Sequence, residues 1–488
     1  MGWLAALLLT PLLGALLVAV LPARWARSLA AFASGLAFLL SVLILLQFDA
    51  RMAGPQLIES RIWNPRLGTH FALAVDGISL AMVLLTTLLG ACTVFASRHI
   101  QHSPRGYYTL LLVLESAVLG VFMARDWALF YVFWELTLIP LFFLIDHWGG
   151  EGRHRAALNF VLYTMGGSVF MLVSLLTLYD LIPQHTFDMA AFTHGGQNLA
   201  APTQVLLFLG LLIGFGVKLP IVPLHGWLPL AHVEAPAPVS ILLSGILLKM
   251  GAYGLLRSVE MFPAAALALQ TPLFVLGATG LLYGGILAYR QTDLKAMIAY
   301  ASISHMGIVL LGLSSLNANG ITAAVLQMVA HGLTAALTFL LVGTLYQRTH
   351  ERDLRRYGRL REIAPRFAFL LTIAFCASAG LPGSAGFIAE LHVLAGGFAR
   401  WGGWLLIVSL GVLIATAYGL RVGGHLLAAR HAHSEITLQD LEGREYAWAL
   451  GLIALIMLLG ILPTLAIDLI GSSAEALARS LLAGTVSR

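Results

Sequence analysis

Residues 210–232 read GLLIGFGVKLPIVPLHGWLPLAH, and this stretch decides what kind of fold the chain adopts. The stretch is apolar for most of its length, yet it contains Lys218 and the prolines Pro220 and Pro223. A proline removes a backbone donor from a helix, so Pro220 leaves the carbonyl of Gly216 without its helical partner. Freed carbonyls at membrane depth need protein or water as partners. We therefore predict a membrane-spanning helix that is interrupted beside Lys218.

The rest of the chain has the same apolar character. Of its 488 residues, 59% are apolar and only 10% are charged, against roughly 25% charged residues in ordinary soluble domains. Mean hydropathy is +0.88, and apolar runs of about 20 residues, enough to cross a hydrocarbon core about 30 Å thick, recur along the chain. These features exclude a soluble enzyme and a secreted disulfide scaffold. The pI of 9.3 comes from arginines spread over many loops, which also excludes a nucleic-acid binder.

Charges and clusters of Gly, Pro and Asn divide the sequence into apolar segments and predict an all-α polytopic membrane protein with about fourteen transmembrane helices. The first apolar run lacks a basic segment before it, so we expect it to be a retained helix rather than a signal peptide. An even number of helices places both termini on one side, and most loop arginines lie on the other, so we expect the termini to face away from the cytoplasm. The expected spans are residues 2–22, 28–47, 72–96, 108–124, 127–147, 156–181, 203–226, 237–258, 268–289, 295–315, 320–345, 364–398, 402–428 and 446–470.

Two of these spans, the seventh and the twelfth, contain helix breakers. The twelfth has Gly380, Pro382, Gly383 and Gly386. The twelfth span comes five after the seventh, an odd step, so the two cross the membrane in opposite directions, as in an inverted repeat. We predict two repeat units of five helices each, with helices 7 and 12 broken. The expected divisions are 1–100 for three N-terminal helices, 104–258 and 268–428 for the two repeat units, and 446–488 for the last helix and a tail.

Seven ionisable side chains inside the expected spans are flanked by apolar residues for most of two turns. A charge near the bilayer centre costs about 2.5–3.5 kcal/mol on insertion scales, so such residues indicate function by default. One buried ion pair would be enough to fix helix packing, whereas this set resembles a line of groups that could pass a proton. Lysine and glutamate can exchange a proton when burial and pairing tune them, and histidine titrates near neutrality. The seven are Glu115, Glu135, Lys218, Lys249, His305, His331 and Glu390.

The remaining candidate residues have simpler interpretations. His147, His225 and His232 lie near span ends, where a solvated position is favoured, and His425, His431 and His433 read as a solvated loop. Cys92 and Cys376 lie in separate spans, which favours packing roles. The sequence contains no HExxH, no CxxC and no Walker lysine motif, so we expect no metal, nucleotide or cofactor in this chain.

Six stretches together resemble the antiporter-like membrane subunits of respiratory complex I, the NADH:quinone oxidoreductase. The resemblance covers roughly residues 70–460, and within the family it is to the M-type chain, the counterpart of mitochondrial NADH dehydrogenase chain 4. The stretches are FYVFWELTLIPLFFLIDHWGG (130–150), VKLPIVPLHGWLPLAHVEAP (217–236), GILLKMGAYGLLR (245–257), QTDLKAMIAYASISHMGIVLLG (291–312), QMVAHGLTAALTFLLVGTLY (327–346) and GLPGSAGFIAEL (380–391).

The resemblance implies a role for each matching residue of a proton relay. Glu135 and Lys218 would form the ion pair of the first half, and Lys249 would be the central lysine. The other members would be His305 and His331 in the central polar axis and Glu390 at the end of the second half.

The resemblance also implies an assembly. This chain would translocate protons in a bacterial inner membrane beside L-type and N-type antiporter-like subunits. NADH, FMN, iron–sulfur clusters and quinone would bind to other subunits. Two alternatives stay open at this point: a subunit of a multisubunit sodium/proton antiporter or membrane-bound hydrogenase, and a structural spacer whose buried pairs serve only packing.

Overall fold

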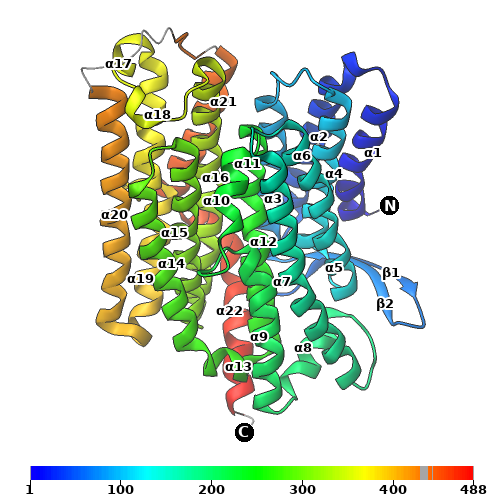
Figure 1. Ribbon diagram of the computed structural model, residues 1–488. Coiled ribbons are helices and arrows are strands. Elements are labelled where there is room, and N and C mark those ends of the chain that lie inside the picture. The colour runs from blue at the N-terminus through cyan, green and yellow to red at the C-terminus, as the bar shows by residue number, and fades with distance from the viewer. Residues whose placement is uncertain (1, 429–437, 442, 487–488) are drawn as a thin grey trace.

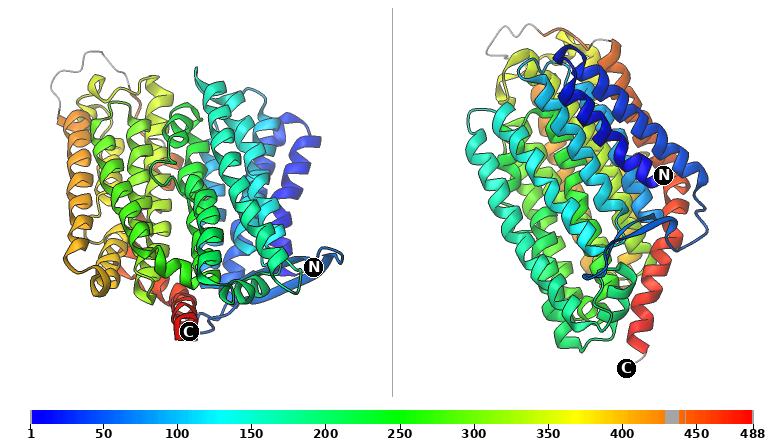
Figure 2. Two further views of the ribbon diagram at one scale, coloured as in Figure 1. Left: turned by 60° about the horizontal axis from the view of Figure 1, so that its bottom comes forward. Right: turned by 90° about the vertical axis from the view of Figure 1, so that its right-hand side faces the viewer.

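A computed structural model describes residues 2–428, 438–441 and 443–486 of the chain (Figure 1). Nearly all elements are helices of one bundle, and in the described residues 13 helical segments are long and apolar enough to cross a membrane. This confirms the predicted all-α polytopic class. The N-terminal end of α1 and the C-terminal end of α22 lie toward the same side of the bundle, which we call the terminal face; the opposite side is the loop face (Figure 2).

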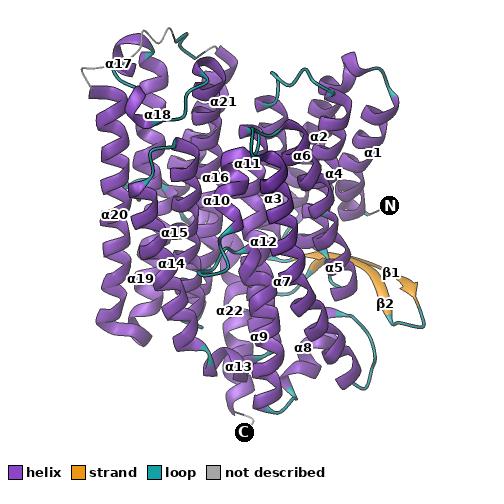
Figure 3. Ribbon diagram, viewed as in Figure 1, coloured by secondary structure: helices purple, strands orange, loops and turns teal. Residues whose placement is uncertain are grey.

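The N-terminal region contains a β-hairpin that the sequence did not predict (Figure 3). The expected span 72–96 is wrong at its start, because residues 72–75 belong to strand β2 and the helix begins only after Asp76. The Asp76 side chain accepts the N–H of Ser79 at 2.9 Å and so caps that helix. The elements are α1 (Trp3–Val20), η1 (Ala23–Trp25), α2 (Ala26–Gln47), β1 (Gln56–Asn64), β2 (Thr69–Val75), α3 (Gly77–Ala96) and α4 (Pro104–Met123).

The interruption predicted beside Lys218 is confirmed. Helix α9 ends at Lys218, and α10 begins only at Trp227. The carbonyl of Gly216 accepts the N–H of Ile221 at 2.9 Å, so the protein itself satisfies the group that Pro220 frees. The elements of this region are α5 (Trp127–Leu136), α6 (Leu138–Trp148), α7 (Arg153–Leu181), α8 (Met189–Gln197), α9 (Ala201–Lys218), α10 (Trp227–Glu234), α11 (Ala237–Leu242), the π-helical turn η2 (Leu243–Leu247), α12 (Leu248–Met261) and α13 (Pro263–Ala268).

The second predicted interruption is also present, between Ser378 and Ala385. Gly380 and Gly383 have φ of +73° and +94° there, a region that favours glycine. The expected span 446–470 is wrong at its end, because the helix stops at Ile461 before Pro463. The elements are α14 (Gln270–Arg290), α15 (Leu294–Ser314), α16 (Ala318–Thr349), η3 (Leu354–Arg356), α17 (Leu360–Ile363), α18 (Pro365–Ser378), α19 (Ala385–Trp401), η4 (Gly402–Leu405), α20 (Leu406–Gly423), η5 (Gly424–Ala428), α21 (Gly443–Ile461) and α22 (Thr464–Val486).

Small residues let the central helices approach one another closely. Gly284 of α14 faces α15 so closely that an added methyl group would lie 2.6 Å from the amide nitrogen of Ser304. Glycine at such contacts allows backbones to pack where lipid provides no hydrophobic driving force. The segments Ala237–Met261, Leu294–Ser314 and Ala318–Thr349 are almost entirely buried in the bundle. Side chains on these helices are therefore held away from lipid and solvent.

Candidate functional site

Lys218 lies at the first helix interruption and is 1% exposed. Its ammonium donates to the Thr137 hydroxyl at 2.9 Å and lies 4.6 Å from the centre of the Trp134 ring. Thr137 stands where α5 gives way to α6, one turn after Trp134. The cation therefore has a hydroxyl and an aromatic face as its immediate partners.

Glu135, the expected partner of Lys218, lies near it but is not its contact. Its carboxylate is within electrostatic range of the lysine. Among the described residues, however, no ion pair of 4.0 Å or less joins Glu135 to Lys218. Glu135 is only partly buried, while its Oε1 is buried without a hydrogen-bond partner among the described residues.

Lys249 lies in the middle of the bundle and is 0% exposed. It follows the π-helical turn Leu243–Leu247, which widens the helix and leaves the Ser244 carbonyl to accept the lysine ammonium at 2.6 Å. The ammonium also contacts Nδ1 of His331, on α16, at 2.6 Å. Two predicted site residues that are 82 positions apart in the sequence are thus in direct contact.

A second histidine extends this contact across the bundle. The rings of His331 and His305 have centroids 5.2 Å apart. His305, on α15, has Gln327 Nε2 3.2 Å from its Nδ1 and the Ser378 hydroxyl 3.3 Å from its Nε2. Ser378 is the last residue of α18, so this row reaches the second helix interruption.

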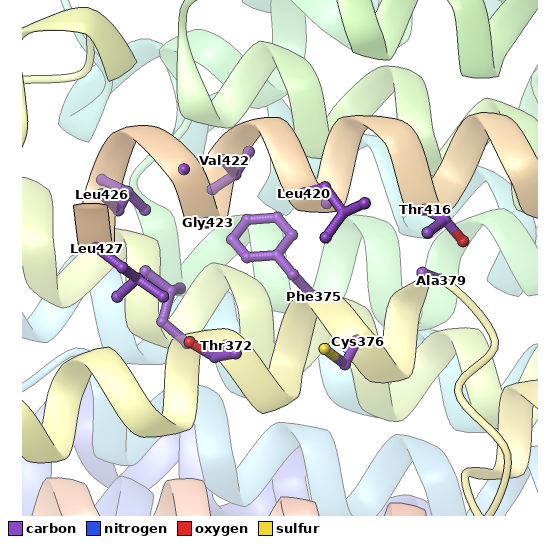
Figure 4. A pocket seen from close by; sticks show the side chains of 13 residues that line it. Thr372, Phe375, Cys376, Ala379, Thr416, Leu420, Val422, Gly423, Leu426 and Leu427 are labelled. Atoms are coloured by element: carbon purple, nitrogen blue, oxygen red, sulfur yellow. The ribbon is translucent and has the colours of Figure 1, made fainter. Parts of the chain in front are cut away.

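Glu390 lies on the far side of that interruption, on α19, and is 5% exposed. Its carboxylate packs against Gly380, where a Cβ atom would meet Glu390 Oε2 at 2.5 Å. The carboxylate lines a cavity of about 390 Å³ together with Thr416 and Cys376. A second, apolar cavity of about 280 Å³ between α18 and α20 shares Cys376, Ala379 and Thr416 with it (Figure 4). Tyr418 is also near, within electrostatic range of Glu390 and in contact with Ser378.

Glu115 belongs to a different region of the bundle. It is buried on α4, where Oε2 accepts the hydroxyl hydrogen of Ser34 from α2 at 2.7 Å. The Glu115 carboxylate lies against Gly90 of α3, which has no side chain and so leaves room for it. The structure thus places Glu115 in the packing between α2, α3 and α4.

Two residues near the loop face are buried although they lie at or beyond the ends of expected spans. Lys295, the first residue of the expected span 295–315, is 3% exposed, and its ammonium donates to the Ala235 carbonyl at 2.7 Å. His232 was expected to be solvated but is fully buried, stacked on Phe339 at 4.8 Å, and both of its ring nitrogens are without hydrogen-bond partners among the described residues. A sequence signal for Lys295 existed: Asp293 caps α15, so the helix begins before the lysine.

Sequence reasoning also missed three polar residues of the row. Gln327, Ser378 and Tyr418 are uncharged, and single polar residues in apolar spans are common enough to carry no signal by themselves. The structure identifies them because they lie beside His305 and Glu390.

A cluster of opposite charges lies near the terminal face. Arg257 lies on α12, near the end of the expected span 237–258. Its side chain is only 9% exposed, and its Nη2 lies 2.5 Å from Asp76 Oδ2. Arg125 reaches the same oxygen at 3.9 Å. Burial by itself raises the pKa of Asp76, but Arg257, Arg125 and the Ser79 N–H together hold this pKa below its usual value.

The row Lys249, His331, His305, Ser378 combines groups that can both bind and release a proton. Lys249 contacts His331 at 2.6 Å and His305 lies 3.3 Å from the Ser378 hydroxyl, while the two imidazole rings have centroids 5.2 Å apart. In the described residues of the chain, no three His, Cys, Asp or Glu side chains are grouped so that they could hold a metal ion. The arrangement is therefore suited to carrying protons sideways through the bundle from the central lysine toward Glu390.

Comparisons with known proteins match this chain over most of its length. A family model described as "NADH:quinone oxidoreductase/Mrp antiporter, TM" matches residues 124–416. NAD(P)H-quinone oxidoreductase chain 4 2 of Thermosynechococcus vestitus is 39% identical, over 98% of this chain and 92% of its own. NADH-quinone oxidoreductase subunit M of Rhodobacter capsulatus is 39% identical over 92% and 90%. A chain in the structure of respiratory complex I from Thermus thermophilus with bound NADH superposes with a TM-score of 0.90 at 32% identity, over 98% of this chain and 99% of that one.

Proposed function

The chain belongs to the family of transmembrane subunits found in NADH:quinone oxidoreductases and Mrp antiporters, and from this membership we propose that it is the M-type, proton-translocating membrane subunit of an NADH:quinone oxidoreductase. The observation that carries the proposal is the contact of Lys249 with His331 at 2.6 Å, continued by His305, in the fully buried middle of the bundle. A structural ion pair would need a carboxylate as the partner of the lysine. An imidazole can both accept and donate a proton, as a proton relay requires.

The proposed route runs from the loop face to Glu390. Protons enter from the cytoplasm, load Lys218 or Lys249, pass through His331 and His305, and leave near Glu390. The cavity of about 390 Å³ beside Glu390 supports an exit there, because water could reach the carboxylate through it. Glu135 then controls the charge on Lys218 from its nearby position.

The energy for this transport comes from other subunits in the proposed assembly. Moving one proton against 100 mV costs about 2.3 kcal/mol. Redox chemistry with NADH, FMN, iron–sulfur clusters and quinone would supply it elsewhere, and L-type and N-type chains would be the neighbours in a bacterial inner membrane, with both termini on the non-cytoplasmic side.

Residues 104–258 and 268–428 form an inverted repeat in this proposal, flanked by the N-terminal helices of residues 1–100 and by the C-terminal residues 446–488. Two parallels support the repeat: α9 ends at Lys218 and α18 ends at Ser378, each beside a proline- or glycine-containing interruption. The two helices also run in opposite directions, α9 from the terminal face and α18 from the loop face (Figure 1).

The test is NADH-driven acidification of inverted membrane vesicles, with wild type and Glu135→Gln compared at matched levels of assembled complex. We expect the variant to acidify much less per NADH oxidised. Unchanged acidification would refute a role for Glu135. Sodium-dependent proton exchange without NADH in the wild type would instead favour the antiporter function.

A further inference from the structure

We propose that Arg257 is a fixed cationic barrier that closes a second, straight path from Lys249 to the terminal face and so forces protons sideways to Glu390. The inference rests on the proposed proton transport through Lys249. It goes further by assigning a function to a charged cluster outside the row of relay groups.

A polar stripe on α12 leads from the central lysine toward the terminal face. Lys249, Tyr253 and Arg257 are each four residues apart and therefore lie on one face of the helix. With a rise of 1.5 Å per residue, the backbone of Arg257 lies about 12 Å below that of Lys249. The helix runs from the buried centre toward α13 at the terminal face (Figure 1). This stripe joins the central lysine to the terminal end of the bundle within a single helix.

The Tyr253 hydroxyl cannot relay a proton along this stripe in the observed arrangement. It donates to the Phe122 carbonyl at 3.3 Å and accepts from Arg257 Nη2 at 3.2 Å. The Arg257 guanidinium also lies 4.8 Å from the centre of the Tyr253 ring. The hydroxyl proton is thus directed at a carbonyl, and its lone pair faces a cation.

Arg257 itself is a group that proton transfer cannot pass through. A guanidinium carries donors only and does not give up its proton in proteins. Its side chain is 9% exposed, and its Nε is buried without a hydrogen-bond partner among the described residues. Arg125 and Arg257 share the single carboxylate of Asp76, and Glu260, within electrostatic range of Arg257, is a further acidic group. A fixed cation on this stripe repels an approaching proton.

The lateral row has the opposite chemistry. His331 and His305 each have a nitrogen that can accept a proton and one that can donate it. A proton on Lys249 therefore meets groups that accept it on one side and a permanent cation on the other. The same barrier keeps protons of the terminal face from returning to Lys249 when the complex is idle.

The experiment measures passive proton leak, without NADH, in proteoliposomes containing the assembled complex under an imposed potassium diffusion potential. Arg257→Met removes the cation from an apolar surrounding. Because that variant removes the nearer cation from the buried Asp76 and leaves Arg125 at 3.9 Å, the double variant Asp76→Asn with Arg257→Met is made beside it. Asp76→Asn alone is the matched control, since it breaks the ion pair but keeps the cation.

We expect a leak about tenfold or more above wild type in the double variant and in Arg257→Met, with Asp76→Asn as tight as wild type. A tight double variant would overturn the barrier. An equal leak in Asp76→Asn would also overturn it, because the ion pair and not the cation would then seal the path. NADH-driven pumping is scored separately in the wild type, so a failure of the proposed transport is distinguishable from a failure of the barrier.

Discussion

Replacing His331 tests the relay at its tightest link. His331 Nδ1 is 2.6 Å from the Lys249 ammonium, and the next titratable ring, His305, has its centroid 5.2 Å from that of His331. Proton transfer needs donor and acceptor at about 2.6–3.2 Å or one intervening water. In His331→Leu the side chain can neither accept nor donate a proton, so Lys249 loses the titratable group that connects it to His305.

The magnitude follows from the loss of a positioned proton-transfer group. Such a group contributes about 10²–10⁴-fold to the rate of its step, which corresponds to about 3–5 kcal/mol of barrier. This step lies in series with all other transfer steps in the chain, so proton transport through this chain falls to about 1% or less of its wild-type rate. The number of protons pumped per NADH therefore drops by nearly the whole contribution of this chain.

The assay is NADH-driven acidification of inverted vesicles, normalised to NADH oxidation and to the amount of assembled complex. His331→Gln is the matched control, because glutamine can hydrogen-bond Lys249 but cannot carry a proton. We expect both variants to lose the protons per NADH that this chain contributes. Full pumping by His331→Leu would refute the relay, and recovery in His331→Gln would show that the position needs a hydrogen bond and not a titratable group.

Three further predictions follow from single contacts. Thr137→Val removes a hydrogen bond to the Lys218 ammonium that is worth about 1.5–3 kcal/mol. We expect slower NADH-driven pumping in this variant and a rate close to wild type in Thr137→Ser, which keeps the hydroxyl. Equal pumping rates in the two variants would contradict this role of Thr137. Glu390→Gln is expected to impair pumping in a complex that still assembles on native gels, and loss of assembly alone would point to a packing role. Because the pKa of Asp76 is lowered in the fold, its ion pair stabilises fully above about pH 4 and is lost as pH falls through the folded value. Asp76→Asn should therefore lower the Tm of the complex at pH 7, at a cost of about 3–5 kcal/mol, and the difference should shrink in acid; a constant difference would disprove the linkage.

The sequence predicted the features that depend on local backbone chemistry. Pro220 and Pro223 remove donors wherever they stand, so the end of α9 at Lys218 could be placed before any packing was known. Gly380 and Pro382 marked the second interruption for the same reason. The length and apolarity of the spans are likewise properties of consecutive residues, and they predicted the polytopic class.

Errors at the ends of spans have a physical cause. The apolar run before α3 continues into β2, because Phe71 and Leu73 are as suited to a strand as to a helix. Only the pairing with β1, where Leu73 lies opposite Glu59, made those residues a hairpin. Hydropathy by itself does not distinguish the two.

The partners of the candidate residues were decided by tertiary structure. Each residue turns a helix by about 100°, so a small change in helix rotation decides which neighbour a side chain meets. Lys218 meets Thr137 with Glu135 close by, and Lys249 meets His331, which is 82 positions away. The sequence by itself therefore determined that this chain carries ionisable groups into a membrane and where its helices break. The packing of the helices decided which of those groups touch, and with that the direction in which a proton can move.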